Sequence, residues 1–263
     1  MTVKLHWAET GQGATVIVLH GLFGMGSNLG ALARSLQAEH RVYSVDLPNH
    51  GRSDWLSGAD IPAMADCIGE WMDQRGLRKA SFVGHSLGGK VAMEVALQHS
   101  RRVNALVVAD IAPVSYEPHH DSVFAALDAV SSAHCESRAQ AAVLMAEHVS
   151  EQMVIQFLLM SLQRNAEGLY HWRFNLEEIK NSYGAIRAGL GSNRTYTGPV
   201  LFVKGGESDY ILESHRDPIR NMFPQSTLKI MRGCGHWLHA EQPRLFNSIV
   251  QRFLLSPLKG HTE

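Results

Sequence analysis

The chain has 263 residues, of which 45% are hydrophobic, and this length suits one large α/β domain with an inserted subdomain. Lys and Arg number 24 against 25 Asp and Glu, so no net field exists to attract nucleic acid or anionic lipid. No apolar run is long enough to span a bilayer, and the start of the chain lacks the apolar stretch of a signal peptide. We therefore expect neither a nucleic-acid nor a membrane partner.

Cysteine usage predicts the compartment. Cys67, Cys135 and Cys234 are far apart in the chain and show no C-x-x-C spacing. That pattern argues against a disulfide framework and against a zinc site, and it suits a reducing compartment. We therefore expect a cytoplasmic protein.

The first part of the chain predicts two strands and a glycine-rich loop. Val3, Leu5 and Trp7 alternate with polar residues, which predicts a half-exposed strand. The continuous apolar run at 15–19 predicts a strand buried on both faces of a parallel sheet. The loop that follows could bind a dinucleotide, but the third glycine of that motif would fall at position 29, which is Leu29. We therefore expect no nucleotide cofactor.

Apolar patterns along the rest of the chain alternate between helical and strand periods. Helices are predicted at 28–37, 61–75, 87–98 and 245–255, and strands at 41–46, 81–84, 105–109, 200–204 and 227–231. Such alternation predicts a mostly parallel sheet with helices on both faces. Functional sites in sheets of this kind lie beyond the carboxyl ends of the strands.

Between residues 112 and 190 the pattern changes. Strand patterns vanish, and helical patterns follow one another at 123–130, 143–149 and 154–162. We therefore predict a helical cap at 112–190, inserted into a core formed by residues 1–111 and 191–263.

The sequence Gly84-His85-Ser86-Leu87-Gly88 has the G-x-S-x-G spacing of a nucleophile elbow, between a predicted strand and a predicted helix. A serine on so sharp a turn has a strained backbone, and side chains two positions away on either side would collide. Ser86 is therefore the predicted nucleophile. We expect the backbone N–H groups of Leu87 and Leu22 to form an oxyanion hole. His20, before Leu22, is expected to be a buried structural donor.

A serine hydroxyl needs a base, and the base needs an acid to orient it. His236 is the predicted base, because it follows the last predicted strand. Asp110 and Asp209 both follow earlier strands, and the residues alone do not choose between them. His236 and His239 have the spacing of a metal pair, but no third ligand cluster accompanies them, so no metal is expected.

Four segments carry a resemblance to a known family: residues 20–24, 84–90, 110–113 and 235–241. Together they resemble the YbfF-type esterases of the α/β-hydrolase superfamily, and the similarity spans nearly the whole chain. The resemblance implies an α/β-hydrolase fold and places the acid in the Asp-Ile-Ala-Pro segment, at Asp110. The superfamily at large more often uses the position after the seventh strand, here Asp209. We take Asp110 as the acid and keep Asp209 as the alternative.

The resemblance also implies hydrolysis of carboxylic esters, with acyl-CoA thioesters as one natural class. An apolar wall for the acyl chain is predicted from five residues, Phe23, Phe124, Leu158, Leu159 and Trp237. The same fold also hosts C–C bond hydrolases and lyases. An alternative from another class is a ligand-binding protein that turns over little.

Overall fold

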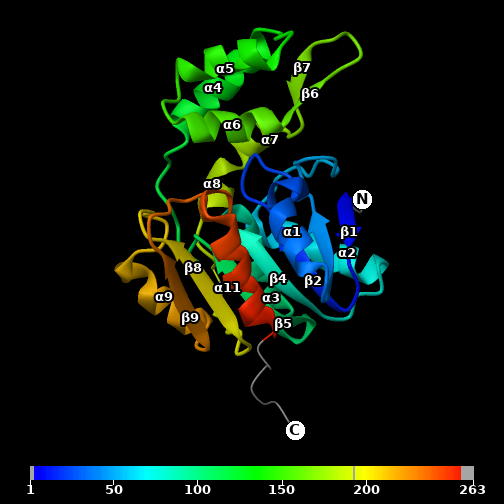
Figure 1. The fold of residues 1–263 in the computed structure, drawn as a ribbon, viewed down its shortest axis with the longest axis vertical. Coiled ribbons are helices and arrows are strands. Elements are labelled where there is room, and N and C mark those ends of the chain that lie inside the picture. Colours follow the sequence, from blue (N-terminus) through cyan, green and yellow to red (C-terminus); the bar gives the residue numbers. More distant parts are fainter. Residues whose placement is uncertain (1–2, 192, 256–263) are drawn as a thin grey trace.

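The computed structural model describes residues 3–191 and 193–255. Residues 1–2, 192 and 256–263, which belong to the predicted core ranges, lie outside the described residues. Figure 1 shows an α/β body with a mainly helical segment stacked above it. No helix within the described residues has the length and apolarity needed to cross a membrane.

The body is built on a seven-stranded sheet with the order β1-β3-β2-β4-β5-β8-β9. Its strands are β1 Trp7–Thr10, β2 Ala14–Leu19, β3 His40–Val45, β4 Ala80–His85, β5 Val103–Ala109, β8 Val200–Gly205 and β9 Ser226–Met231. Strand β1 is antiparallel to β3, and all other neighbours are parallel. The predicted mostly parallel sheet is thus confirmed.

The first strand starts later than the alternation of apolar residues suggests. Pairing with β3 begins only at Trp7, opposite Val45. Before Trp7 the backbone bonds to loops, since the carbonyls of Lys4 and His6 accept the N–H groups of Asp54 and Asp46. The prediction of a strand from Val3 was therefore wrong by four residues at its start.

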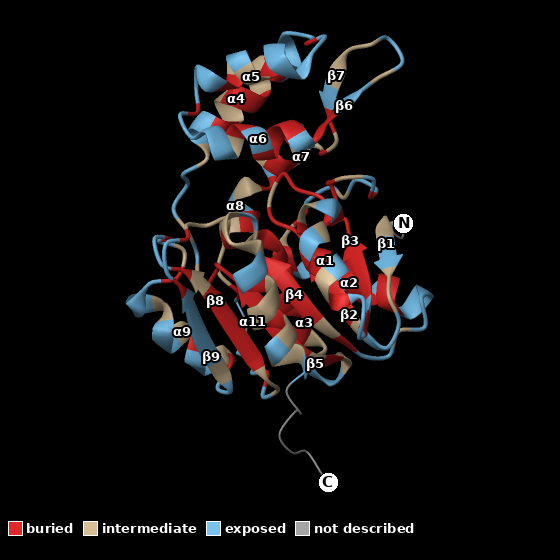
Figure 2. Cartoon of the chain, viewed as in Figure 1, coloured by how far each residue is buried: buried red, intermediate tan, exposed pale blue. Residues whose placement is uncertain are grey.

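Successive residues of the central strands face opposite helical layers. Ile17 and Leu19 belong to the hydrophobic cluster under the helices at 61–74 (α2) and 87–98 (α3), whereas Val16 and Val18 belong to the cluster under the helices at 30–36 (α1) and 243–255 (α11). Both faces of the middle of the sheet are covered, so β2, β3, β4, β5 and β8 are mostly buried, whereas the edge strands β1 and β9 are largely exposed (Figure 2). The flanking elements are η1 Gly26–Leu29, α1 Gly30–Leu36, α2 Ile61–Gln74, α3 Leu87–Gln98, η2 Ser100–Arg102, η3 Glu213–His215, α9 Arg216–Met222, α10 Leu238–Glu241 and α11 Pro243–Leu255.

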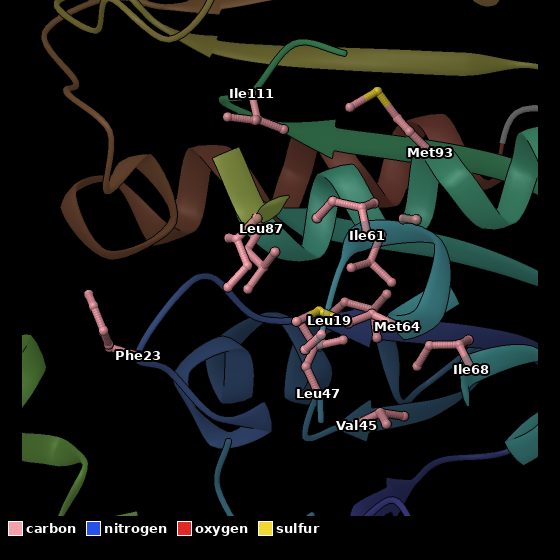
Figure 3. Close-up of a cluster of buried hydrophobic side chains, with 14 of the residues drawn as sticks. Leu19, Phe23, Val45, Leu47, Ile61, Met64, Ile68, Leu87, Met93 and Ile111 are labelled. Atoms are coloured by element: carbon pink, nitrogen blue, oxygen red, sulfur yellow. The ribbon is translucent and has the colours of Figure 1, made fainter. Parts of the chain in front are cut away.

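The cluster under α2 and α3 anchors the start of α3. Leu87, the first residue of that helix, is 4% exposed and packs into the same buried cluster as Leu19, Ile61 and Met64 (Figure 3). Apolar burial of this kind contributes roughly 1.5–3 kcal/mol for a leucine side chain. The helix therefore begins at a fixed place immediately after Ser86.

Residues 112–190, here called the cap segment, lie over the carboxyl ends of the parallel strands (Figure 1). They form α4 Asp121–Ser132, α5 Arg138–Ala146, α6 Gln152–Met160, β6 Leu162–Arg164, β7 Tyr170–Trp172, α7 Leu176–Asn181 and α8 Tyr183–Arg187. The antiparallel pair of β6 and β7 contradicts the expectation of helices alone. Leu162 continues the apolar pattern of α6, but that helix ends at Met160 and Leu162 pairs with Trp172. Strands of three residues are too short to show a period of two.

Candidate active site

The turn at Ser86 joins β4 to α3 with strained backbone geometry. Ser86 has φ 51° and ψ −117°, a positive φ that residues with a Cβ rarely adopt. A Cβ on Gly84 would lie 2.2 Å from the carbonyl oxygen of Gly88, and one on Gly88 would lie 2.4 Å from the carbonyl oxygen of Leu19. Glycine is therefore required at both positions, for the steric reason expected from the motif. The Ser86 N–H donates to the Ala109 carbonyl at 3.0 Å, which ties the turn to the neighbouring strand.

The loop after β2 lies beside this turn. A Cβ on Gly21 would lie 3.4 Å from the Ser86 Cβ, and Leu22 lines the same cavity as Ser86 and Leu87. His20, the residue before Gly21, is 1% exposed. Its Nδ1–H donates to the Gly21 carbonyl at 2.8 Å, because its Nε2 accepts the Leu47 N–H at 3.0 Å.

His20 thus has the structural role expected from the sequence. Burial lowers its pKa, and the nearby Asp46 opposes this only in part, so the ring stays neutral. Both ring nitrogens are occupied by backbone groups, which leaves no nitrogen of His20 available to act on a substrate.

His236 follows β9 and is hydrogen-bonded to Asp110, which follows β5. His236 Nδ1 lies 2.8 Å from Asp110 Oδ2. The carboxylate is fully buried and also accepts the Gly205 N–H at 2.9 Å and the Ser208 hydroxyl. A carboxylate can only accept, so the neutral His236 has its proton on Nδ1 and a free lone pair on Nε2.

Asp209, the alternative acid, is placed differently. Its side chain is exposed, and among the described residues the acid hydrogen-bonded to His236 is Asp110. The neighbouring residue Ser208 points inward and donates to Asp110, which turns Asp209 toward solvent. The structure therefore brings Asp110, and not Asp209, to the histidine.

The loop around His236 is held from several sides. Glu241 accepts the Gly235 N–H at 2.9 Å and the Trp237 N–H at 3.2 Å, so one carboxylate fixes the backbone on both sides of the histidine. His85, the variable residue of the serine turn, is 3% exposed and its Nε2 lies 2.9 Å from the His236 carbonyl oxygen. Within the described residues no hydrogen bond joins Ser86 Oγ to His236, and catalytic contacts of this type often shorten only when substrate binds.

Tyr210 packs flat on His236, a contact that the sequence analysis did not find. The two ring centroids are 3.9 Å apart at an interplanar angle of 20°, and the Tyr210 hydroxyl lies 2.6 Å from His119 Nε2. His119 Nδ1 bonds the Glu117 carbonyl at 2.8 Å, so its Nε2 accepts the proton of Tyr210. The Tyr210 carbonyl in turn accepts the hydroxyl of Tyr116 at 2.6 Å. A tyrosine one position past Asp209 gives no pattern that could reveal this stacking.

Removal of the Tyr210 ring is expected to slow turnover. In Tyr210→Leu the imidazole of His236 loses the ring that packs on its face and can shift. Because small displacements of catalytic groups lower the rate strongly, we expect kcat for a small ester to fall about tenfold with little change in KM. Tyr210→Phe is the matched control, since it keeps the ring and loses only the bond to His119. Equal losses in both variants would show that the hydroxyl, and not the stacking, matters.

The cavity in front of Ser86 has a volume of about 310 Å³. Its walls come from both the core and the cap segment: Gly21, Leu22, Phe23, His85, Ser86, Leu87, Lys90, Ile111, Tyr116, His119, His120, Ser122, Val123, Val149, Glu151, Val154, Phe157, Leu158, Tyr183, Ile186, Arg187, Tyr210, His236 and Trp237. The mixture of aromatic and aliphatic side chains with a few polar groups is typical of small-molecule sites.

Three of the five residues predicted for the apolar wall line this cavity, namely Phe23, Leu158 and Trp237. Leu159 does not, because Val154 and Leu158 share one face of α6 and the next residue is rotated by about 100° away from it. Leu159 is instead 8% exposed within the buried cluster.

Phe124 is also absent from the lining. Its ring packs against the ring of Phe23, with centroids 5.7 Å apart, so it lies one layer behind the wall. The predictions of direct lining were thus wrong for Phe124 and Leu159. The ring of Phe157 packs at a tilt against that of Trp237, with centroids 4.3 Å apart, and Phe157 takes a place in the wall that was not predicted from the sequence.

Several histidines of the fold are kept neutral by burial. Burial lowers the pKa of His50 to about 3, with the nearby His20 adding to the effect. Burial and His236 lower the pKa of His239 to about 4, and burial likewise lowers that of His85. Among the described residues, no group of three or more His, Cys, Asp or Glu side chains could hold a metal ion.

These neutral histidines predict acid-labile folding. Below about pH 6.5 the unfolded imidazoles bind protons that the folded ones do not, so the free energy of unfolding falls as the pH falls, by about 1.4 kcal/mol per pH unit for each such group. Urea unfolding at pH 7.5 and pH 5 would measure this slope. His239→Phe removes one such group and is expected to reduce the slope. A stability that does not change between the two pH values would contradict the prediction.

The sheet order and the serine turn together form the architecture of an α/β hydrolase. Comparison with protein-family models matches residues 16–249 to the alpha/beta hydrolase family. The chain belongs to this family, and the fold expected from the sequence is confirmed.

Individual relatives indicate which kind of hydrolase the chain resembles. The chain is 40% identical to "Esterase YbfF" of Escherichia coli (strain K12) over 252 residues, which cover 94% of this chain and 97% of the relative. It is 36% identical to the "sn-1-specific diacylglycerol lipase ABHD11" of Mus musculus over 247 residues, 91% of this chain and 80% of the relative. The solved structure "Marine microorganism esterase" superposes with a TM-score of 0.92 at 32% identity, covering 95% of this chain and 99% of that one. The resemblance to YbfF-type esterases is confirmed, and the protein is a hydrolase of the esterase/lipase type.

Proposed function

We propose that the protein hydrolyses carboxylic acyl esters through an acyl-enzyme formed on Ser86. The observation that supports this best is the bond between His236 Nδ1 and the buried Asp110, which leaves His236 Nε2 free in the cavity that Ser86 also lines. Asp209 is set aside as the acid, because its side chain is exposed.

In the first half-reaction, Ser86 Oγ attacks the carbonyl carbon of the ester while His236 Nε2 takes the hydroxyl proton. Asp110 holds the Nδ1–H and stabilises the imidazolium that forms. The negative charge on the carbonyl oxygen is met by the N–H groups of Leu22 and Leu87, and the second of these is the N-terminus of α3. His236 then gives its proton to the leaving alcohol.

In the second half-reaction, water loses a proton to His236 and attacks the acyl group on Ser86. The carboxylic acid leaves, and Ser86 recovers its proton from His236. The apolar wall of Phe23, Leu158 and Trp237 would hold the acyl chain during both steps.

The proposed substrate class extends to acyl-CoA thioesters, because the same attack cleaves a thioester bond. Diacylglycerols are a further candidate substrate, because the mouse relative is named a diacylglycerol lipase. We also propose a cytoplasmic location, which the three free buried cysteines support.

Trapping with a serine-directed fluorophosphonate, followed by peptide mapping, tests the proposal. The label is expected on the peptide that contains Ser86. A panel of p-nitrophenyl esters of increasing acyl length, acyl-CoAs and a diacylglycerol then ranks the substrates. Label on another residue, or turnover of none of these compounds, would favour a C–C bond hydrolase, a lyase or a ligand-binding protein on the same fold.

A further inference from the structure

Lys90 is a buried basic side chain that the proposed mechanism does not use. It lies on α3 one turn after the nucleophile, where its backbone N–H donates to the Ser86 carbonyl at 3.1 Å. The residue is 2% exposed. Its Nζ donates to the carbonyl oxygens of Arg187 at 2.8 Å and Ala188 at 2.6 Å, and lies 4.9 Å from the ring centroid of Tyr116.

These three partners belong to the two segments that connect the cap to the core. The outgoing segment, residues 113–116, and the returning segment, residues 187–190, are here called the cap base. They are joined by hydrogen bonds from the N–H of Tyr116 to the Arg187 carbonyl at 3.1 Å and from the N–H of Leu190 to the Pro113 carbonyl at 3.1 Å. The Arg187 guanidinium also donates to the Tyr116 carbonyl at 2.6 Å. Lys90 therefore attaches both connections to the helix that follows the nucleophile.

Stability does not explain a lysine at this place. Burial, with the nearby Arg187 charge adding to it, lowers the pKa of Lys90 to about 7. The partners that Nζ contacts in the described part of the chain are two carbonyl oxygens and a ring, with no carboxylate among them. A buried charge without a counter-charge is unfavourable, and an apolar side chain of similar size often serves stability equally well or better.

The cavity walls suggest a function for the contact between Lys90 and the cap base. Its far wall is formed by cap residues, among them Val154, Phe157 and Leu158, whereas Ser86 and His236 follow strands of the core. A small tilt of the cap base would move the far wall relative to the nucleophile and leave the catalytic groups in place. Such a tilt would change the space available to an acyl chain.

We propose that Lys90 is a positioning residue that fixes the cap base to the nucleophile helix and thereby sets the acyl-chain specificity of the enzyme. The inference rests on the proposed ester hydrolysis for its kinetic consequence and on the contacts of Lys90 for its structural one. Lys90 also lines the cavity; in this proposal it acts through the cap base and takes no part in bond making or breaking.

The substitution Lys90→Met tests this, with Lys180→Met as the matched control. Lys180 lies in the cap segment but pairs with Asp128 on the cap itself, with Nζ 2.9 Å from Oδ2. For Lys90→Met we expect the ratio of kcat/KM for p-nitrophenyl octanoate to that for p-nitrophenyl acetate to fall about tenfold, mainly through KM of the octanoate. The melting temperature should not fall. The Arg187 carbonyl still accepts the Tyr116 N–H, and only the Ala188 carbonyl loses its hydrogen-bond donor. Lys180→Met should leave the ratio unchanged.

Hydrogen–deuterium exchange supplies a readout that does not depend on activity. Peptides covering residues 113–116 and 187–190 should exchange faster in Lys90→Met than in the unmodified protein, while the peptide covering β4 should not. Where Lys90→Met does not fold, Lys90→Gln replaces it, because the amide retains two donors. Unchanged exchange would overturn the proposal: with an unchanged ester ratio Lys90 only fills space, and with a changed ratio it acts directly as part of the cavity wall. A protein that exchanges as predicted but hydrolyses no ester would overturn the proposed function and leave the cap attachment supported.

Discussion

Replacement of Ser86 by alanine is expected to lower kcat for a short-chain p-nitrophenyl ester by about 10⁴-fold or more, the usual loss when the nucleophile of such a triad is removed. Alanine retains the Cβ and therefore tolerates the φ of 51° as serine does, so the fold should be intact. No other described group bonds the Ser86 hydroxyl, and its loss leaves no partner unpaired. Steady-state kinetics and the circular dichroism spectrum are the two measurements.

Ser81→Ala is the matched control for that experiment. Ser81 lies on the same strand, β4, five residues before the nucleophile, and its substitution should leave kcat within about twofold. Fluorophosphonate labelling should disappear in Ser86→Ala and persist in Ser81→Ala. Activity of Ser86→Ala within tenfold of the unmodified protein would mean that another group carries the chemistry.

Local patterns in the sequence were enough to predict where the chemistry lies. Parallel strands bring their carboxyl ends to one edge, so Ser86, Asp110, Asp209 and His236 were expected at that edge from chain order alone. The serine turn was predictable in more detail, because the clash that requires glycine at position 84 is with Gly88 of the same turn, although the clash at position 88 is with the carbonyl oxygen of Leu19 at the end of β2. The steric demand within the turn leaves a direct trace in the sequence as the G-x-S-x-G spacing.

Contacts between distant loops leave no such trace. Asp110 and Asp209 differ by their surroundings. The Ser208 hydroxyl and the Gly205 N–H donate to Asp110, whereas the Asp209 side chain is exposed. That choice depends on how the loop after β8 packs against the end of β5, which no periodicity encodes. From the residues alone both acids stayed open, and the preference for Asp110 came from a family resemblance.

The same limit explains the errors in the apolar wall. Helical spacing identifies the buried residues of α6, but it does not say which buried face meets the cavity and which meets the rest of the cap. Leu158 and Leu159 are both apolar and both buried, and only the first lines the cavity. The hairpin of β6 and β7 was missed because each of its strands has three residues, too few to show a strand period.

The choice between the two acids can be tested directly by exchanging each carboxylate for an amide. Asp110→Asn is expected to lower kcat by about 10⁴-fold, as an amide in place of the triad acid does. The reason lies in the hydrogen bonds: the Gly205 N–H holds one oxygen of the side chain, so the NH₂ group takes the position of Oδ2 beside His236. It then donates to Nδ1, the imidazole proton moves to Nε2, and the histidine cannot accept the proton of Ser86.

Asp209→Asn is the matched control for Asp110→Asn, because it makes the same chemical change at an exposed position one strand away. Its kcat should stay within about twofold of the unmodified enzyme, since the Asp209 side chain is exposed and surface substitutions usually have small effects. Fluorophosphonate labelling should slow with kcat in Asp110→Asn and be unchanged in Asp209→Asn. The circular dichroism spectrum of each variant shows whether it is folded. A variant pair in which Asp209→Asn loses turnover and Asp110→Asn retains it would reverse the assignment, and would require the β8 loop to turn Asp209 inward during catalysis, at the expense of the bond between Asp110 and His236.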